Sequence, residues 1–265
     1  MDFPPTESPG GFTRPSAKMD KKRLDLLVME KRGFSRLYAR EVIEAGLVLV
    51  KGKAALRPGR MVFDHEADEI KILAHDMPYV SRGGYKLARA LEAFDIYLSG
   101  LECLDAGAST GGFTDCMLKA GARLVWAVDV GREQMAPALK ADPRVILHEG
   151  VDIRDFTLPK PVDFAACDVS FISAAKVLPS LKGLIKAGGG LVCLVKPQFE
   201  TGGRLSSKRG VVRDEKTREA ALSSFLAALE SNGFSLAGTT ESPITGRDGN
   251  VEYLTYAINR QEGFP

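Results

Sequence analysis

CLDAGASTGGFTDCMLKAG, which runs from Cys103 to Gly121, is the stretch that decides the fold. An apolar run ends in a cluster of small residues, and a helical pattern begins directly after the cluster. Three glycines, a serine and a threonine occupy the turn between the two patterns. Glycine permits backbone conformations and close approaches that a Cβ atom would prevent. The turn therefore predicts that something comes very near to the backbone here.

Two nucleotide-binding motifs are excluded at this turn. Gly107 and Gly112 have the spacing of a phosphate-binding P-loop, but Phe113 stands where that motif needs a lysine. The G-x-G-x-x-G spacing of a dinucleotide-binding turn is absent as well. A nucleoside ligand with a small charged tail remains, and S-adenosylmethionine fits that description. Its methionine part would lie across Gly107, Ser109 and Gly111, with helix-end amides near its carboxylate.

Acidic residues follow the next two apolar runs. Asp129 lies 22 positions after Gly107, where a carboxylate can accept hydrogen bonds from both ribose hydroxyls. Asp152 follows the third run, where a group that contacts adenine would lie. Each acid taken alone is better explained as the cap of a helix or turn, but their positions at successive strand ends favour a shared site. The predicted cofactor-binding residues are Asp105, Gly107, Ala108, Ser109, Thr110, Gly111, Gly112, Phe113, Asp129, Asp152 and Asp168.

Strand-like and helical patterns alternate from residue 83 onward. Strands are expected at 101–107, 123–131, 144–150, 162–171, 189–199, 234–243 and 250–259. Helices are expected at 83–96, 113–121, 132–141, 173–188 and 215–233, the third interrupted by Pro137, and a long polar loop at 200–213. This alternation predicts a Rossmann-like α/β fold, a mostly parallel seven-stranded sheet with helices on both faces.

The composition is that of an ordinary globular protein: of 265 residues, 45% are hydrophobic and 26% charged. Residues 1–17 are rich in Pro, Gly and Ser, so we expect a disordered tail and no signal peptide there. No apolar run approaches the ~20 residues that span a bilayer, and a cytoplasmic location without membrane contact is the expectation. The four cysteines form no C-x-x-C pair and the three histidines no metal-binding spacing, so we expect reduced thiols and no metal.

Positive charge is concentrated near the N-terminus. Between Arg14 and Arg60 there are 13 Lys or Arg and 5 Asp or Glu, a net charge of +8, whereas the whole chain carries +2. Residues 18–78 are expected to form a small α+β unit of two helices, ended by Gly33 and Gly46, and a hairpin. Its basic side chains would contact the phosphates of a polyanionic backbone, or would form a solvated charged face. They are Arg32, Arg36, Arg40, Lys51 and Lys53.

Two resemblances rest on these motifs. RLD, GFSR and AREVIEAGLVLVKG resemble the S-four-type RNA-binding domain of the small ribosomal subunit. SRGGYKLARAL, LDAGASTGGFTDC, DVSFIS, VKPQFE, KRGVVRD and SPITGRDGNVEYL resemble the hemolysin-A (TlyA) family of ribosomal-RNA 2′-O-methyltransferases, whose catalytic domain is FtsJ-like. Together these motifs extend over nearly all of the chain from Lys21 to Asn259. The resemblance implies an S-four-like domain at 18–78 and a methyltransferase domain at 79–262.

The family resemblance also implies a catalytic Lys-Asp-Lys-Glu set. It corresponds to Lys86 in GGYKLA, Asp168 in CDVSF, Lys196 in VKPQF and Glu252 in NVEYL. The implied reaction is transfer of a methyl group from S-adenosylmethionine to a cytidine ribose 2′-hydroxyl in ribosomal RNA. A second cation lowers the pKa of a buried lysine while carboxylates oppose that shift, so we take Lys196 as the base and Lys86 as the group that orients the hydroxyl. Asp168 and Glu252 would hold the two ammonium groups.

The polar loop FETGGRLSSKRGVVRD, residues 199–214, carries a second group of basic residues. Arg204, Lys208 and Arg209 would contact RNA phosphates beside the active site, or would belong to a mobile solvated loop. Phe171 and Phe199 each lie three residues from a member of the catalytic set. Either ring could stack on a splayed-out base, although packing in the core is the favoured interpretation for both.

Two other functions compete with the enzyme hypothesis. The chain could be a non-catalytic RNA-binding or ribosome-assembly factor with the same fold. It could be a membrane-active hemolysin, which the mixed charges on the polar face of residues 215–233 disfavour. The sequence does not decide which nucleotide or which ribosomal subunit is modified, or whether the chain is a monomer or a weak homodimer.

Overall fold

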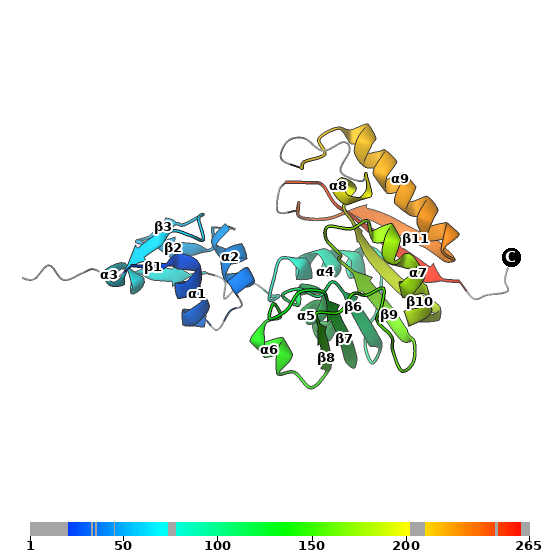
Figure 1. Cartoon of the computed structure of the whole chain (residues 1–265), viewed down its shortest axis with the longest axis horizontal. Coiled ribbons are helices and arrows are strands. Elements are labelled where there is room, and N and C mark those ends of the chain that lie inside the picture. The colour runs from blue at the N-terminus through cyan, green and yellow to red at the C-terminus, as the bar shows by residue number, and fades with distance from the viewer. Residues whose placement is uncertain are drawn as a thin grey trace, which may run out of the picture.

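A computed structural model describes residues 21–32, 34, 36–44, 46–73, 78–201, 210–246 and 249–260. The tail expected at residues 1–17 lies outside these ranges. Figure 1 shows the elements from β1 to β5 grouped at one end of the molecule, apart from the large sheet. In the described parts of the chain, no helix is long and apolar enough to cross a membrane.

The N-terminal elements form a small α+β unit around a core of their own. The buried core of this unit includes Leu24 and Val28 from α1 and Val42 and Ile43 from α2. Two small antiparallel sheets complete it, β1 with β4 and β3-β2-β5. The bounds are β1 Lys21–Arg23, α1 Leu24–Arg32, α2 Arg36–Glu44, β2 Val48–Val50, β3 Lys53–Ala54, β4 Met61–Phe63, α3 Asp64–Ala67 and β5 Ile70–Ile72. The predicted helices and hairpin are present, and three further strands of three residues join them.

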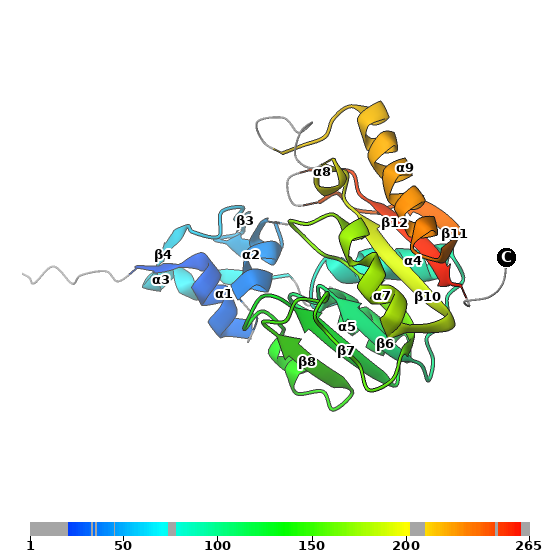
Figure 2. The same ribbon diagram turned by 45° about the vertical axis from the view of Figure 1, so that its right-hand side comes forward.

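The second part is built on a seven-stranded sheet in the order β11-β12-β10-β9-β6-β7-β8, with β11 and β8 at opposite edges (Figure 2). The strand pairs from β10 to β8 are parallel, and β12 runs antiparallel to both of its neighbours. This is the predicted mostly parallel sheet. The bounds are β6 Glu102–Ala106, β7 Leu124–Asp129, β8 Val145–Glu149, β9 Val162–Cys167, β10 Ile185–Val195, β11 Phe234–Glu241 and β12 Tyr253–Asn259.

The strand order reverses beside β6. The chain runs from β6 outward through β7 to β8 and then returns to the other side of β6 with β9. In open α/β sheets, ligands bind outside the carboxyl ends of the strands at such a reversal. The turns that follow β6, β7, β9 and β10 therefore meet at one edge of the sheet.

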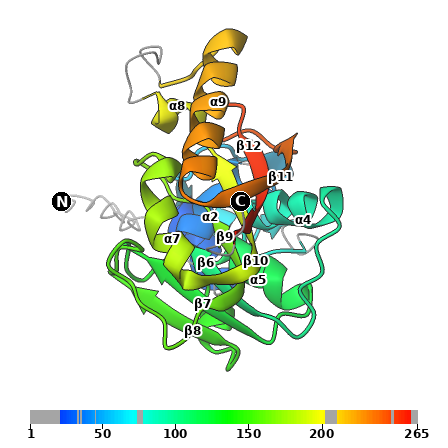
Figure 3. The ribbon, with the colours of Figure 1, turned by 90° about the vertical axis from the view of Figure 1, so that its right-hand side faces the viewer.

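Helices cover both faces of the sheet, as predicted, and each face has its own apolar core. Figure 3 shows α4 and α5 on one side and α7 and α9 on the other. The bounds are α4 Gly83–Ala93, α5 Gly112–Lys119, α6 Pro137–Lys140, the 3₁₀ helix η2 Ala174–Val177, α7 Leu178–Leu184, α8 Pro197–Glu200 and α9 Glu215–Ser231.

Two of the expected helices are shorter than the sequence pattern indicates. The helix expected at 132–141 begins only at Pro137, because proline disfavours the helical conformation of the preceding residue, and Ala136 is extended with ψ 135°. The helix expected at 173–188 opens as η2 and ends at Leu184. Residues from Ile185 onward belong to β10, whose register shifts between Ile185 and Gly190.

Candidate active site

The turn from β6 into α5, residues 107–112, is called the corner below. Gly107 and Gly111 have φ of +90° and +95°, and Ser109 also lies in the left-handed region with φ +46°. A Cβ atom on Gly107 would lie 2.5 Å from the backbone oxygen of Asp168, and one on Gly111 would overlap Leu139. The close approach predicted from the sequence is therefore made, at these two glycines, by the protein's own neighbouring segments.

The partly exposed part of the corner faces Asp129 at the end of β7. The backbone N–H of Ser109 donates to Asp129 Oδ2 over 2.8 Å, and the N–H of Gly131 donates to Oδ1 over 2.6 Å. Each carboxylate oxygen still has acceptor capacity, because it can take a second hydrogen bond. Gln134 supports this arrangement by accepting from the Ser109 hydroxyl over 3.1 Å. Gln134 carries no motif that would have identified it from the sequence.

Several of the residues predicted to bind the cofactor have side chains that are buried beneath the corner. Asp105 is 1% exposed, and its Oδ2 accepts from the Thr114 hydroxyl over 2.6 Å. Burial raises the pKa of Asp105 to about 7, against the hydrogen bond from Thr114, which lowers it. The side chains of Ala108, Thr110 and Phe113 are buried as well. These residues give the corner its shape from beneath.

Asp152 is engaged by its own turn. Its carboxylate forms a fork with the Arg154 guanidinium, with 2.6 Å between Oδ2 and Nη2, and it also accepts from the Arg154 backbone N–H. These hydrogen bonds lower the pKa of Asp152 to about 2. The arrangement is that of a turn cap, the alternative considered for this residue, and its adenine contact stays a prediction.

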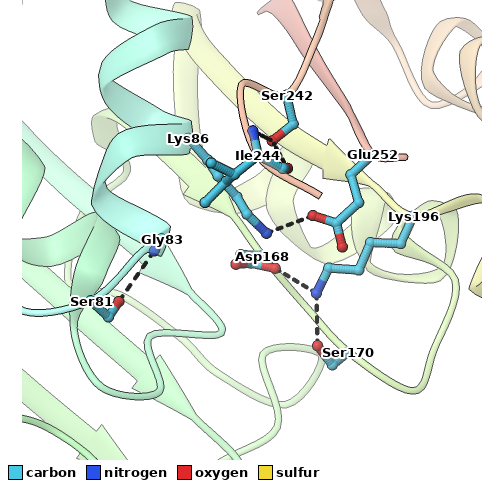
Figure 4. A network of polar contacts seen from close by, with 9 residues as sticks. All are labelled: Ser81, Gly83, Lys86, Asp168, Ser170, Lys196, Ser242, Ile244 and Glu252. Carbon is cyan, nitrogen blue, oxygen red and sulfur yellow. Dashed lines mark hydrogen bonds and ion pairs between the residues drawn. The ribbon is translucent and has the colours of Figure 1, made fainter. Parts of the chain in front are cut away.

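Four charged side chains from four separate elements point into one space beside the corner (Figure 4). Lys86 comes from α4, Asp168 follows β9, Lys196 follows β10 and Glu252 precedes β12. Lys86 Nζ lies 2.5 Å from Glu252 Oε2, and Lys196 Nζ lies 2.6 Å from Asp168 Oδ1. The structure thus brings together the whole predicted set, called the tetrad below, and pairs each ammonium group with a carboxylate.

Burial and charge act in opposite directions on the tetrad. Burial alone would raise the pKa of Asp168, but the Lys196 and Lys86 ammonium groups outweigh it and hold that pKa below its ordinary value. Burial would lower the pKa of Lys196, but Asp168 and Glu252 prevail and raise it. Of the influences on the Lys196 pKa that were expected from the sequence, the carboxylates have the larger effect. In the protein alone, Lys196 is therefore an ammonium ion at neutral pH.

The loop after β9 adds two groups to the site. Lys196 Nζ donates to Ser170 Oγ over 2.7 Å, a contact that the sequence reasoning missed. Phe171 is 89% exposed and has φ +70°, so the expectation that it packs in the core is wrong. Its ring centroid lies 5.8 Å from that of Phe199, which is partly buried. A bulky residue in a left-handed conformation is rare, and Phe171 directly follows Ser170, which contacts Lys196.

The predicted RNA-binding residues that the structure describes are in the N-terminal unit. Arg36 and Arg40 on α2, and Lys51 and Lys53 around the β2–β3 turn, have exposed side chains. Arg36, Arg40 and Lys51 also lie within 4.0 Å of acidic side chains, and Arg32 donates to the backbone oxygen of Ile72. Arg204, Lys208 and Arg209 lie outside the described residues. Within the described ranges, no group of three His, Cys, Asp or Glu side chains is placed to hold a metal ion.

Comparison with known proteins places the chain among methyltransferases. The sequence model described as "FtsJ-like methyltransferase" matches residues 79–258. The "16S/23S rRNA (cytidine-2′-O)-methyltransferase TlyA" of Mycobacterium tuberculosis is 42% identical over 84% of this chain and 84% of that protein. The "23S rRNA (cytidine-2′-O)-methyltransferase TlyA" of Campylobacter jejuni is 34% identical over 89% and 99%. A solved structure from Streptococcus thermophilus, named as a candidate hemolysin, is similar with a TM-score of 0.73 and 38% identity over 92% and 90%.

Proposed function

Because the chain belongs to the FtsJ-like methyltransferase family, we propose that it transfers a methyl group from S-adenosylmethionine to the 2′-hydroxyl of a cytidine in ribosomal RNA. The observation that carries this proposal is the tetrad: two ammonium groups and two carboxylates converge beside the corner at the carboxyl edge of the sheet. Because ribosomal RNA is the proposed substrate, we expect the protein to act in the cytoplasm.

The corner fits the proposed cofactor. Asp129 offers carboxylate oxygens that each accept a single backbone N–H, which leaves capacity for a pair of ribose hydroxyls. Gly107 and Ser109 are the partly exposed positions of the turn, and the backbone there can approach a ligand closely. When bound, S-adenosylmethionine supplies a methyl group on a positively charged sulfur, which is a strong electrophile.

The tetrad supplies alignment first and proton transfer second. Lys86 would orient the ribose hydroxyl and Lys196 would take its proton. Since the pKa of Lys196 is raised in the protein alone, its ammonium group must lose a proton before it can act as a base. A further positive charge beside it would lower that pKa, and Asp168 and Ser170 keep the nitrogen in place during the exchange. Because the electrophile is strong, alignment contributes most of the acceleration.

The RNA would be held at two places. The exposed basic residues of the N-terminal unit give an affinity for phosphates without sequence readout. At the active site, the exposed ring of Phe171 would stack on the base of the acceptor nucleotide after that base leaves its helix. This places the ribose of the same nucleotide near Lys196, which contacts the neighbouring Ser170.

The test is to map 2′-O-methyl groups on ribosomal RNA from cells with and without the protein, and to repeat the transfer with purified protein. We expect a cytidine that loses its methyl group without the protein and regains it in vitro on RNA or subunits from those cells. Binding of RNA without any methyl transfer would favour the assembly-factor hypothesis and contradict the enzyme. Methyl transfer to a base atom would contradict the proposed acceptor.

A further inference from the structure

Glu200 ends α8, the short helix that starts directly after Lys196. Its side chain crosses to the loop that follows β9. Glu200 Oε2 accepts from the Ser173 hydroxyl over 2.5 Å, and Oε1 accepts from the Ala174 backbone N–H over 2.7 Å. Both carboxylate oxygens are therefore committed to one short segment, 26 and 27 residues earlier in the chain.

The segment that Glu200 holds begins at Asp168. Ser173 is the N-cap of η2, where its own hydroxyl also accepts from the Ala175 N–H over 3.2 Å. Between Asp168 and Ser173 lie Ser170 and Phe171. The Glu200 carboxylate thus connects the element that starts at Lys196 with the loop that carries Asp168, the partner of Lys196.

The apolar packing of this loop comes from Val169 and Ile172, which are partly buried against the core, and not from the two residues between them. Phe171 is almost fully exposed and Ser170 is exposed as well. The left-handed conformation of Phe171 is strained and persists only where the surroundings impose it. The contacts from Lys196 to Asp168 and Ser170 fix one end of the loop, and the two hydrogen bonds to Glu200 fix the other.

We propose that Glu200 is a positioning residue for methyl transfer: its carboxylate fixes the loop 168–173 against α8, so that Asp168, Ser170 and Phe171 keep their places around Lys196. This inference rests on the proposed function. Glu200 acts through the loop and makes no contact with the reacting atoms. A misplacement of about 1 Å can lower a rate by up to ~10²-fold, so the loss of two hydrogen bonds at the base of this loop has a measurable effect.

The test compares Glu200→Ala with Glu200→Gln in steady-state methyl transfer by the full chain. Alanine removes both hydrogen bonds, and we expect kcat to fall at least ~10-fold while the KM for S-adenosylmethionine stays within about twofold. Glutamine can still accept from Ala174 and donate to Ser173, so it restores kcat to within about threefold of wild type. Glu219→Ala, an exposed glutamate on α9, is the matched control and keeps wild-type kinetics.

Three results would overturn the inference. Wild-type kcat in Glu200→Ala would show that the loop does not need the bridge. An equal loss in the glutamine variant would mean that the negative charge acts, and a raised cofactor KM with unchanged kcat would assign Glu200 to binding. If Glu200→Ala does not fold, Ser173→Ala removes the bond to Glu200 Oε2 together with the cap bond from the Ala175 N–H, leaves the Ala174 bond in place, and must lower kcat about two- to fivefold. Absence of methyl transfer by the wild-type chain would instead contradict the proposed function.

Discussion

The corner and the tetrad lie side by side but are built in different ways. The corner is one contiguous stretch, and close packing of backbone against backbone gives it its shape, as Gly107 shows against Asp168. The tetrad draws on four elements, and its Lys86–Glu252 pair joins residues 166 positions apart. The corner therefore depends on fitted shape, whereas the tetrad depends on balanced charge. Substitutions should affect cofactor binding at the first and catalytic rate at the second.

Lys196→Ala should have the largest effect, and this effect should be on kcat and not on cofactor affinity. It removes the proposed base and leaves Asp168 without its partner at 2.6 Å. We expect kcat to fall ~10³-fold, within the usual range for the loss of a general base. The affinity for S-adenosylhomocysteine, measured by calorimetry, should change less than about threefold because the corner is untouched. Lys216→Ala on the exposed side of α9 is the control.

Near-normal turnover of a folded Lys196→Ala protein would remove Lys196 from the chemistry. An equal loss of cofactor affinity would show that the corner and the tetrad are one structural unit and do not act separately.

The corner and the tetrad should also differ in how their contributions to stability depend on pH. Burial raises the folded-state pKa of Asp105 to about 7, from an ordinary value of 3.8. Between these values the folded protein binds more protons than the unfolded chain, so stability falls as pH rises, by about 1.4 kcal/mol per pH unit at most. Asp105→Asn resembles the protonated form and can still accept from Thr114. Chemical denaturation at pH 5 and pH 7 should show a smaller loss of stability in the variant.

The tetrad should not respond over the same range. The pKa of Asp168 is lowered, so its contribution to stability is lost only as pH falls through that low value. The pKa of Lys196 is raised, so its contribution is lost only as pH rises through that high value. A wild-type protein and an Asp105→Asn variant with the same dependence on pH from 5 to 7 would contradict the assignment to Asp105.

Asp129→Ala is the corresponding test of the corner. It removes two backbone hydrogen bonds, from Ser109 and Gly131, together with the proposed ribose acceptor. We expect the affinity for S-adenosylhomocysteine to fall ~10²-fold, because hydrogen bonds to a charged group contribute about 1.5–3 kcal/mol. At saturating cofactor, kcat should stay within about threefold. Asp155→Ala changes an exposed acid in the turn after β8 and should bind S-adenosylhomocysteine normally. If Asp129→Ala also binds it normally, the ribose must lie elsewhere.

The sequence predicted much of this arrangement where a pattern is local. The corner, its flanking strand and helix, and the position of Asp129 follow from apolar runs and small residues that are near one another in the chain. The tetrad was predicted by resemblance, and the sheet order then explains why Asp168 and Lys196 meet at one edge, after the adjacent strands β9 and β10. The strands β1, β4 and β5 were missed because three residues are too short to show periodicity, whereas the equally short β2 lies within the apolar run LVLV.

What the sequence could not predict depends on distances between distant segments. The direction of the Lys196 pKa shift is set by a competition between burial and two carboxylates, and no pattern encodes its outcome. Gln134 and Glu200 are ordinary polar residues in the sequence, and their hydrogen-bond partners lie 25 to 27 positions away. The exposure of Phe171 depends on a loop conformation in the left-handed region, which is rare for a bulky residue.

Phe171→Leu should have the smallest effect of these variants, and it tests whether the tetrad extends to the RNA. Because the side chain is 89% exposed, its loss should leave the free energy of unfolding unchanged within about 0.5 kcal/mol. Base stacking on an aromatic ring contributes about 1–3 kcal/mol, so kcat/KM for ribosomal RNA should fall ~10-fold, while Phe171→Tyr keeps the ring and the rate. The affinity for S-adenosylhomocysteine should not change, since the corner is intact. A leucine variant as active as wild type would show that the ring is exposed for another reason, and the acceptor nucleotide would then have to be positioned by the ribose contacts of Lys86 and Lys196 alone.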